Sequence, residues 1–419
     1  MNANERELDY CFADRIPAPG TVMQVAPNIA WIRMPLPFAL DHINLWLIRD
    51  VPLSSDGVSH AVTPVGRMTQ GERTTQGDQA DVLGDASFDA ASIVAQIVPK
   101  RSGAPLDPGY LDGWTIIDCG IGDATTQAYW ETILASSLEQ VPVHRVLCTH
   151  FHPDHFGLAD WLCHGAGNQR WQARLWMTLG EYATGRLFAE AGAASDAGGA
   201  TAAAHMRRHG FADAVALEQI AHKAAYYPQL VPAVPPRYRR LHGGDVLRLG
   251  GQDWRVIIGE GHSPEHAALY SEALNILIAG DMVLPRISTN VSVSDLEPEG
   301  DPLGAFLASL HAYDDLPADT LVLPSHGKPF RGLPIRLRQL HEHHAARLAE
   351  VVEACHATPR CAAEIVPIMF RRPLDAHQMT FALGEALAHL HYLWHRGVLS
   401  REEDAAGIWR FGVTGSTAP

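Results

Sequence analysis

Four potential metal ligands stand close together directly after a short apolar segment, and this pattern constrains the fold more than any other. They are His150, His152, Asp154 and His155. The preceding segment, Arg145–Cys148, predicts a buried β-strand, and sites in layered α/β folds gather where strands end and loops begin. Zinc favours imidazole and carboxylate ligands, and a catalytic zinc keeps one position open for water. The cluster therefore predicts a metal site at the end of a strand.

Three further potential ligands follow other short apolar segments. His262 lies in Gly-His-Ser-Pro, Asp281 ends the segment Ile276–Asp281, and His326 follows the apolar run that begins at Thr320. A single histidine in such a position is more often an ordinary loop residue than a metal ligand. A carboxylate at the end of a wholly apolar strand, however, is costly to bury unless a cation or partner neutralises it. Their joint occurrence, in order and always at strand ends, favours a shared metal centre.

These signatures, together with Asp118 at the end of the strand expected over Trp114–Gly120, resemble those of the metallo-β-lactamase fold superfamily. The resemblance covers roughly residues 20 to 330. It implies an α/β fold, an αββα sandwich in which two mixed sheets face each other, helices lie outside and the metals sit at one edge. It also implies two zinc ions per chain.

The resemblance further implies which side chains would hold each ion. The first zinc would be held by His150, His152 and His262, and the second by Asp154, His155 and His326, with Asp281 bridging the two. Asp118 would be an outer residue that orients the ligand loop.

The chain is predicted to contain a catalytic domain over 1–330 and a smaller domain over 331–419. Within the first, residues 50–113 are rich in Gly, Ser, Thr, Asp and Pro, which predicts a mobile surface insertion with one short helix near 87–98. Residues 178–240 predict a helical lid, within a stretch from Leu158 to Tyr238 that is expected to be mostly helical. Apolar residues around Gly250-Gly251 predict a hairpin.

The C-terminal part predicts three helices and a hairpin. Leu383, Leu387, Leu390 and Trp394 form one apolar stripe that ends at Gly397. This order is similar to the winged-helix-like C-terminal domain of the β-lactamase-like-protein-2 group. Ten arginines against nine Asp or Glu residues from position 331 onward do not indicate a DNA-binding module. Packing or homodimerisation is the favoured role, and counterparts of the glutathione-contacting residues of glyoxalase II are not evident.

The composition narrows the classes of partner. The formal charge of −15 repels phosphate backbones, so nucleic acid is not an expected partner. No apolar run suggests a signal peptide or a membrane span. Six scattered cysteines without CxxC pairs favour a cytoplasmic protein. The 23 histidines are the unusual feature, and many of them stand in the short motifs that suggest metal ligands.

The favoured function is zinc-dependent hydrolysis of a small ester, thioester or lactone. Two zinc ions lower the pKa of a shared water, and the resulting bridging hydroxide attacks the carbonyl. Asp154 is the catalytic candidate, because its carboxylate can orient the hydroxide and carry its proton. No covalent nucleophile is assigned, and Cys148 on the buried strand is expected to serve packing. Candidate substrate-binding residues are Tyr182, Arg286, Asn290 and Lys328.

Two alternatives stay open. The first is a phosphodiesterase or ribonuclease of the same fold, which the resemblance of the tail favours and the net charge disfavours. The second is a non-haem iron enzyme of the persulfide dioxygenase or flavodiiron type. The ligand set expected for the second metal is complete, and position 152 is a histidine; both observations disfavour the iron enzyme.

Overall fold

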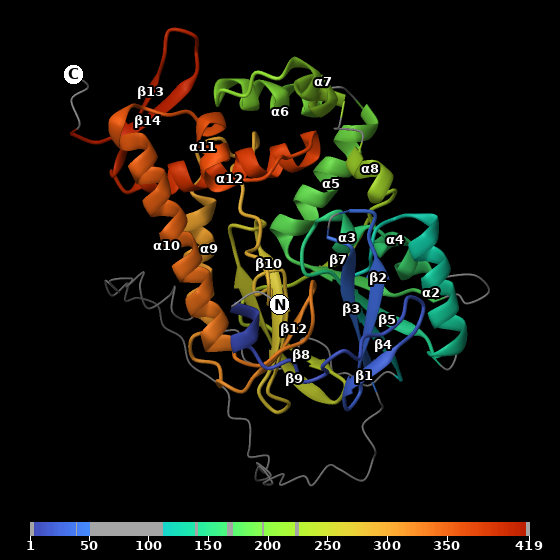
Figure 1. Ribbon diagram of the computed structural model, residues 1–419. Helices are drawn as coiled ribbons and strands as arrows, with labels where there is room; N and C mark the ends of the chain where they lie inside the picture. The colour runs from blue at the N-terminus through green and yellow to red at the C-terminus, as the bar shows by residue number, and fades with distance from the viewer. Residues whose placement is uncertain are drawn as a thin grey trace, which may run out of the picture.

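Two β-sheets face each other in the computed structural model (Figure 1). The structure describes residues 4–38, 40–50, 112–138, 141–165, 171–194, 197–222 and 226–415. Nearly all of the predicted 50–113 insertion, including the helix expected near 87–98, lies outside these ranges.

The first sheet has seven strands in chain order. They are β1 (Met23–Ala26), β2 (Ile29–Pro35), β3 (His42–Asp50), β4 (Gly113–Ile117), β5 (Val143–Leu147), β6 (Arg174–Met177) and β7 (Tyr238–Arg240). Strands β1 to β4 pair antiparallel, and β4 to β7 pair parallel. The sheet is therefore mixed, and the carboxyl ends of its parallel strands share one edge.

The second sheet has five strands in the order β12-β11-β10-β9-β8. Their bounds are β8 (Val246–Leu249), β9 (Gln252–Gly259), β10 (His266–Ser271), β11 (Ile276–Gly280) and β12 (Leu321–Pro324). The predicted hairpin at Gly250-Gly251 is present as the antiparallel pair β8 and β9. Strands β11 and β12 are parallel, so this sheet is mixed as well.

Strand residues alternate between two apolar layers, as the pleat requires. Trp31, Trp46, Ile117, Ile278 and Leu323 pack between the sheets. The other face of the first sheet packs on a cluster that includes α2 (Ala124–Ser136) and α4 (Ala159–His164). The face of the second sheet that points away from the first packs on α9 (Pro302–Leu310), α10 (Leu333–Ala357) and α12 (Ala376–His395). This confirms the αββα sandwich (Figure 1).

The segment between the cluster and the second sheet is not all helical. It holds α5 (Leu179–Ala194), α6 (Ala197–Arg208), α7 (Ala214–His222) and α8 (Tyr226–Leu230), but β6 and β7 flank these helices. The expectation of a mostly helical stretch from Leu158 to Tyr238 is therefore confirmed for the described residues, with β6 as the exception and β7 beginning at its last residue. Both are only three or four residues long, too short for a periodic signal, and their conformation is decided by sheet pairing, of β6 with β5 and of β7 with β6.

The last part of the described chain follows the predicted order. Helices α10, α11 (Ala362–Met369) and α12 precede a hairpin of β13 (Leu399–Glu403) and β14 (Trp409–Val413). Short elements elsewhere are η1 (Asn4–Glu7), η3 (His311–Tyr313) and α3 (Pro153–Phe156). The boundary placed between 330 and 331 stays a prediction, since β11 and β12 share one apolar cluster with α10 and α12. Within the described residues, no helix is long and apolar enough to cross a membrane.

Candidate metal centre

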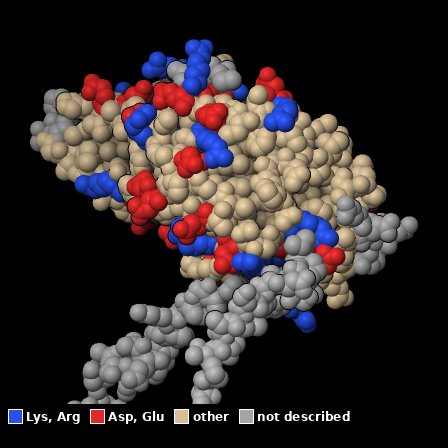
Figure 2. Space-filling view, turned by 90° about the horizontal axis from the view of Figure 1, so that it is seen from below, with Lys and Arg blue, Asp and Glu red and all other residues tan. Residues whose placement is uncertain are grey.

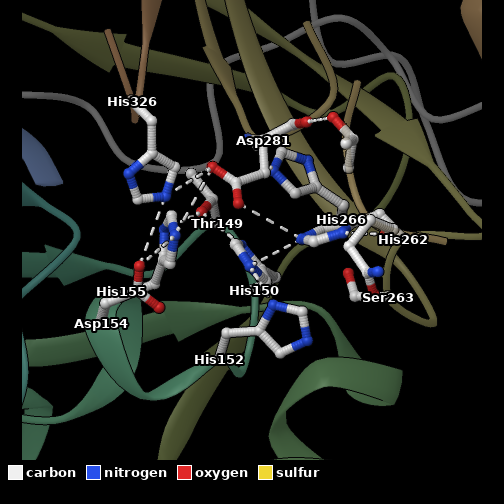
Figure 3. A network of polar contacts seen from close by, with 12 residues as sticks. Thr149, His150, His152, Asp154, His155, His262, Ser263, His266, Asp281 and His326 are labelled. Atoms are coloured by element: carbon white, nitrogen blue, oxygen red, sulfur yellow. Dashed lines mark hydrogen bonds and ion pairs between the residues drawn. The ribbon is translucent and has the colours of Figure 1, made fainter. Parts of the chain in front are cut away.

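Strand register brings the ligand-bearing loops to one edge of the sandwich. In the first sheet, Ile117 of β4 pairs in parallel with Leu147 of β5, so Asp118 and the loop that begins at Thr149 leave the sheet side by side. In the second sheet, β11 and β12 are also parallel, and Asp281 and His326 follow their carboxyl ends. Seven side chains predicted as ligands meet between these loops (Figure 3).

Three imidazoles converge on one side of the centre. His150 Nε2 lies 2.9 Å from His152 Nδ1 and 3.2 Å from His262 Nε2. His150 is fully buried. The ligand atoms of these three residues lie within 4.8 Å of one another, so they can share one cation.

Two imidazoles and a carboxylate form the neighbouring group. Asp154 Oδ2 lies 3.6 Å from His155 Nε2 and 3.4 Å from His326 Nε2. Asp281 stands between the groups: its Oδ1 lies 3.4 Å from His326 Nε2, and its Oδ2 lies 3.4 Å from His262 Nε2. One carboxylate therefore reaches both groups with different oxygens, as the bridging role requires.

Hydrogen bonds at Nδ1, on the side of each ring away from the centre, orient Nε2 of three ligand histidines toward the centre. His155 Nδ1 donates to Asp118 Oδ2 at 2.8 Å, His326 Nδ1 donates to the His42 carbonyl at 2.8 Å, and His262 Nδ1 donates to the Asn290 carbonyl at 2.7 Å. In each ring the bonded Nδ1 leaves Nε2 facing the other ligands. Such outer partners fix the tautomer and orientation of metal-binding histidines.

Asp118 has the backbone conformation that this role needs. Its φ is 61°, a left-handed value that costs free energy for a residue other than glycine and recurs at functional sites. The turn lets its carboxylate accept a bond from the Thr149 N–H at 2.8 Å as well as the bond from His155. The strand-terminal aspartate therefore ties β4 to the ligand loop after β5.

The two groups differ in charge. Burial, together with neighbouring imidazoles, lowers the pKa of His152 to about 3 and that of His150 well below its usual value. Burial acts in the same direction on His155, but Asp154, Asp118 and Asp281 outweigh it and raise the pKa of His155 to about 9. His150 and His152 thus favour the neutral imidazole, whereas carboxylates favour a proton on His155 in the neighbouring group.

The centre has the features of a cation site. His155 Nε2 and Asp281 Oδ1 are buried without a hydrogen-bond partner among the described residues. Ring nitrogens of His150, His152 and His262 lie about 3 Å apart, a spacing at which the three imidazoles can share one cation. These observations fit one metal in each group and Asp281 between them.

Three residues that support the metal ligands were not predicted from the sequence. His266 is buried beside His150, with ring centroids 5.1 Å apart, and its Nε2 accepts the Asp281 N–H at 3.1 Å. Gly280 allows this approach, because a Cβ there would stand 2.2 Å from His266 Nε2. Glu181 accepts from the Phe151 N–H at 3.0 Å and the Ser263 hydroxyl at 2.7 Å, which joins α5 to two ligand loops. Only His266, four residues after His262, had a local signal.

A cavity of about 780 Å³ opens beside His152 and His262. Of the four candidate substrate residues, Asn290 lines it, and Tyr182, Arg286 and Lys328 are not among its described lining residues. Tyr182 is packed in the core, where its hydroxyl donates to the Pro235 carbonyl at 2.9 Å. Lys328 instead pairs with Asp14 at 2.9 Å.

The fold and this cluster define a metal-binding protein of the hydrolase type, and the comparisons place it in a family. Residues 110–326 match the metallo-beta-lactamase superfamily, and residues 348–414 match the metallo-beta-lactamase-like C-terminal domain. The chain therefore belongs to the metallo-beta-lactamase superfamily.

Individual relatives agree with this assignment. A beta-lactamase domain protein from Burkholderia ambifaria is 50% identical, with a TM-score of 0.80 over 99% of this chain and 100% of that one. A metallo-beta-lactamase family protein from Thermus thermophilus, 23% identical over 93% of this chain and 100% of that one with a TM-score of 0.64, shares the fold. "Probable metallo-hydrolase YqjP" of Bacillus subtilis is 22% identical over 71% of this chain and 88% of its own length.

Proposed function

We propose that the chain is a two-zinc hydrolase that cleaves a small ester, thioester or lactone. The observation that carries this proposal is the pair of converging ligand groups, with the Asp281 carboxylate reaching both. When bound, two zinc ions supply a hydroxide nucleophile near neutral pH, because coordination lowers the pKa of water.

The residues of the chain would orient and protect this reaction. The Asp154 side chain is 18% exposed, so one edge of the carboxylate faces the solvent side of the centre. Burial would raise the pKa of Asp154, but His155 and His326 outweigh it and lower the value to about 2. The ionised carboxylate is thus available to align the nucleophile and to receive its proton. His150 and His155 are fully buried and close the inner side to water.

The distribution of charged side chains gives little support to the phosphodiesterase alternative. Among the described residues that line the cavity, none is Lys or Arg. The face seen in Figure 2 shows basic and acidic side chains interspersed, with no continuous basic band among its described residues. A phosphate backbone needs such cations for affinity. The iron alternative is disfavoured by the second ligand set, in which Asp154, His155 and His326 all converge.

A substrate screen combined with metal analysis tests the proposal. Protein purified without added metal is expected to contain close to two zinc ions per chain. It is expected to hydrolyse members of an ester, thioester or lactone panel, with little activity on β-lactam and phosphodiester panels. One iron per chain with oxygen-dependent turnover would support the iron alternative, and phosphodiester cleavage alone would support the other.

A further inference from the structure

The cavity extends from the metal centre into the space between helices of the lid region and the C-terminal part. Its lining includes His152 and His262 at the metals, residues of α5 and α6 on one side, and residues of α12 on another. Its volume of about 780 Å³ lies within the range of small-molecule sites. A substrate whose reacting carbonyl lies at the metals would therefore place its remainder against these helices.

Apolar side chains form a large part of the walls away from the metals. Phe151 stacks on Phe188 with ring centroids 5.7 Å apart, and Phe188, Met206, Leu383 and Leu387 all line the cavity. Phe151 is the immediate neighbour of His152, so the apolar surface begins at the ligands themselves. Burial of methylene groups against such walls contributes about 0.8 kcal/mol each.

The charged residues in the described lining of the cavity are all acidic. Glu260, Asp295, Glu297 and Asp301 belong to the lining, and the described lining contains no Lys or Arg. Asp301 is neutralised by Arg396, whose Nη1 lies 2.7 Å from Oδ2. The others oppose an anionic group, because like charges brought together are unfavourable.

Two imidazoles contribute polarity without charge at the wall formed by α6 and the turn after it. His205 and His209 have ring centroids 4.6 Å apart. His205 Nε2 and His209 Nδ1 are buried without a hydrogen-bond partner among the described residues. Burial lowers the pKa of His209 to about 3. This wall therefore offers hydrogen bonding to a neutral group.

Resting on the proposed hydrolase function, we infer that the cavity selects a mainly apolar acyl group that is several carbons long and has no anionic end. Its ester, thioester or lactone carbonyl lies at the metal centre, and its chain lies along Phe188, Met206 and Leu387. Substrates with a phosphate or carboxylate at the far end of the acyl group are excluded by the acidic lining.

Two ester series on the zinc-loaded full chain test this inference. In the first, 4-nitrophenyl esters run from acetyl to decanoyl, and kcat/KM should rise about threefold or more for each added methylene until the cavity is full. In the second, octanoyl esters end in a methyl, a carboxylate or an ammonium group. The carboxylate should lower kcat/KM at least about tenfold relative to the methyl. A flat or falling length profile, or a preference for the carboxylate end over the methyl and ammonium ends, would overturn the inference.

A pair of charge reversals links the selection to the cavity. Glu297→Lys should increase the ratio of kcat/KM for the carboxylate ester to that for the methyl ester at least about fivefold. Glu272→Lys makes the same change of net charge at an exposed residue outside the lining and should leave this ratio unchanged. Equal ratios for the two variants would contradict a role of the acidic lining.

A binding measurement separates failure of this inference from failure of the hydrolase proposal. Calorimetry with N-methylacetamide, N-methylbutanamide and N-methyloctanamide, which are slow to hydrolyse, should show affinity that increases with length. If no ester is cleaved but this trend is found, the hydrolase proposal fails and the apolar acyl site stands. If esters are cleaved but the amides show no trend, the acyl site fails and the hydrolase proposal stands.

Discussion

Two buried groups of histidines in this chain have opposite surroundings. At the metal centre, His155 and His326 face Asp154 and Asp281. In the C-terminal helices, His344 of α10 meets His389 of α12, with Nδ1 and Nε2 3.2 Å apart, and both residues are fully buried.

The two groups of histidines differ in their pKa values, because the charges around them differ. Burial and cationic or imidazole neighbours lower the pKa of His344 to about 3, and that of His389 to about 4 despite a bond to the Glu385 carbonyl. Among the described residues, ligand atoms converge in threes only at the metal centre. Buried histidines therefore form a cation site where carboxylates and several ring nitrogens share one point, and a neutral packing contact where they do not.

Removal of one histidine from each group gives the largest expected contrast. His152→Ala should lose bound zinc and lower kcat/KM about a thousandfold or more, because the metals contribute several kcal/mol to the transition state. His389→Gln should keep its zinc content and kcat/KM within a few fold. Elemental analysis and steady-state kinetics measure both variants. Undiminished turnover by His152→Ala would refute the two-metal mechanism.

Acidification should destabilise the C-terminal helices through His389. Its folded pKa of about 4 lies below the unfolded value of 6.5, so the unfolded chain binds a proton first as the pH falls. The stability is intact above pH 6.5 and decreases by about 3 kcal/mol as the pH approaches 4.

Urea unfolding of chelator-treated protein at several pH values measures this decrease. His389→Leu should show a shallower dependence between pH 6.5 and 4 than the native chain. His356→Leu, a change at an exposed residue of the same domain, serves as the control and should not alter the slope. Equal slopes for all three proteins would argue against a neutral buried His389.

Loss of Asp118, the hydrogen-bond partner of the ligand His155, should weaken metal binding less than loss of a ligand. Asp118→Ala removes the acceptor of the His155 Nδ1 bond and should lower zinc affinity about 10- to 100-fold, with the fold retained. Competition with a chromophoric chelator measures the affinity. An unchanged affinity would mean that packing and the Thr149 hydroxyl, 3.2 Å from His155 Nδ1, hold the ring without Asp118.

The smallest expected effect concerns Tyr182, a sequence candidate for substrate binding. Tyr182→Phe removes the hydroxyl that donates to the Pro235 carbonyl and should cost about 1 kcal/mol of stability. Its kcat/KM should stay within twofold. A large rise in KM with unchanged stability would restore Tyr182 to the substrate site.

The sequence was informative where a polar residue ends an apolar strand. Asp118, Asp281 and His326 could be identified in this way, because the break in hydropathy is local. The support from Glu181 could not, since it depends on contacts of α5 with the ligand loops that only the fold brings together. His266 had a local signal in its spacing from His262, but its contact with the Asp281 N–H depends on the sheet. Short strands such as β6 and β7 were not predicted, because their conformation also depends on the sheet.

Substrate residues were the least predictable. Arg and Lys near the motifs suggested anion binding, yet Lys328 pairs with Asp14 and the described cavity wall is apolar and acidic. The direction of a side chain, rather than its distance along the chain from a ligand, decides whether it reaches the substrate.

The apolar cluster shared by the second sheet and the C-terminal helices bears on how the protein unfolds. Leu277 and Val322 of the sheet belong to the same cluster as Leu337, Leu387 and Leu390 of the helices. If the chain ended at residue 330, this layer would face water, and β11 and β12, which carry Asp281 and lead to His326, would lose their cover. Residues 1–330 are therefore not expected to fold as an independent unit. Heating is expected to give one cooperative calorimetric transition rather than two.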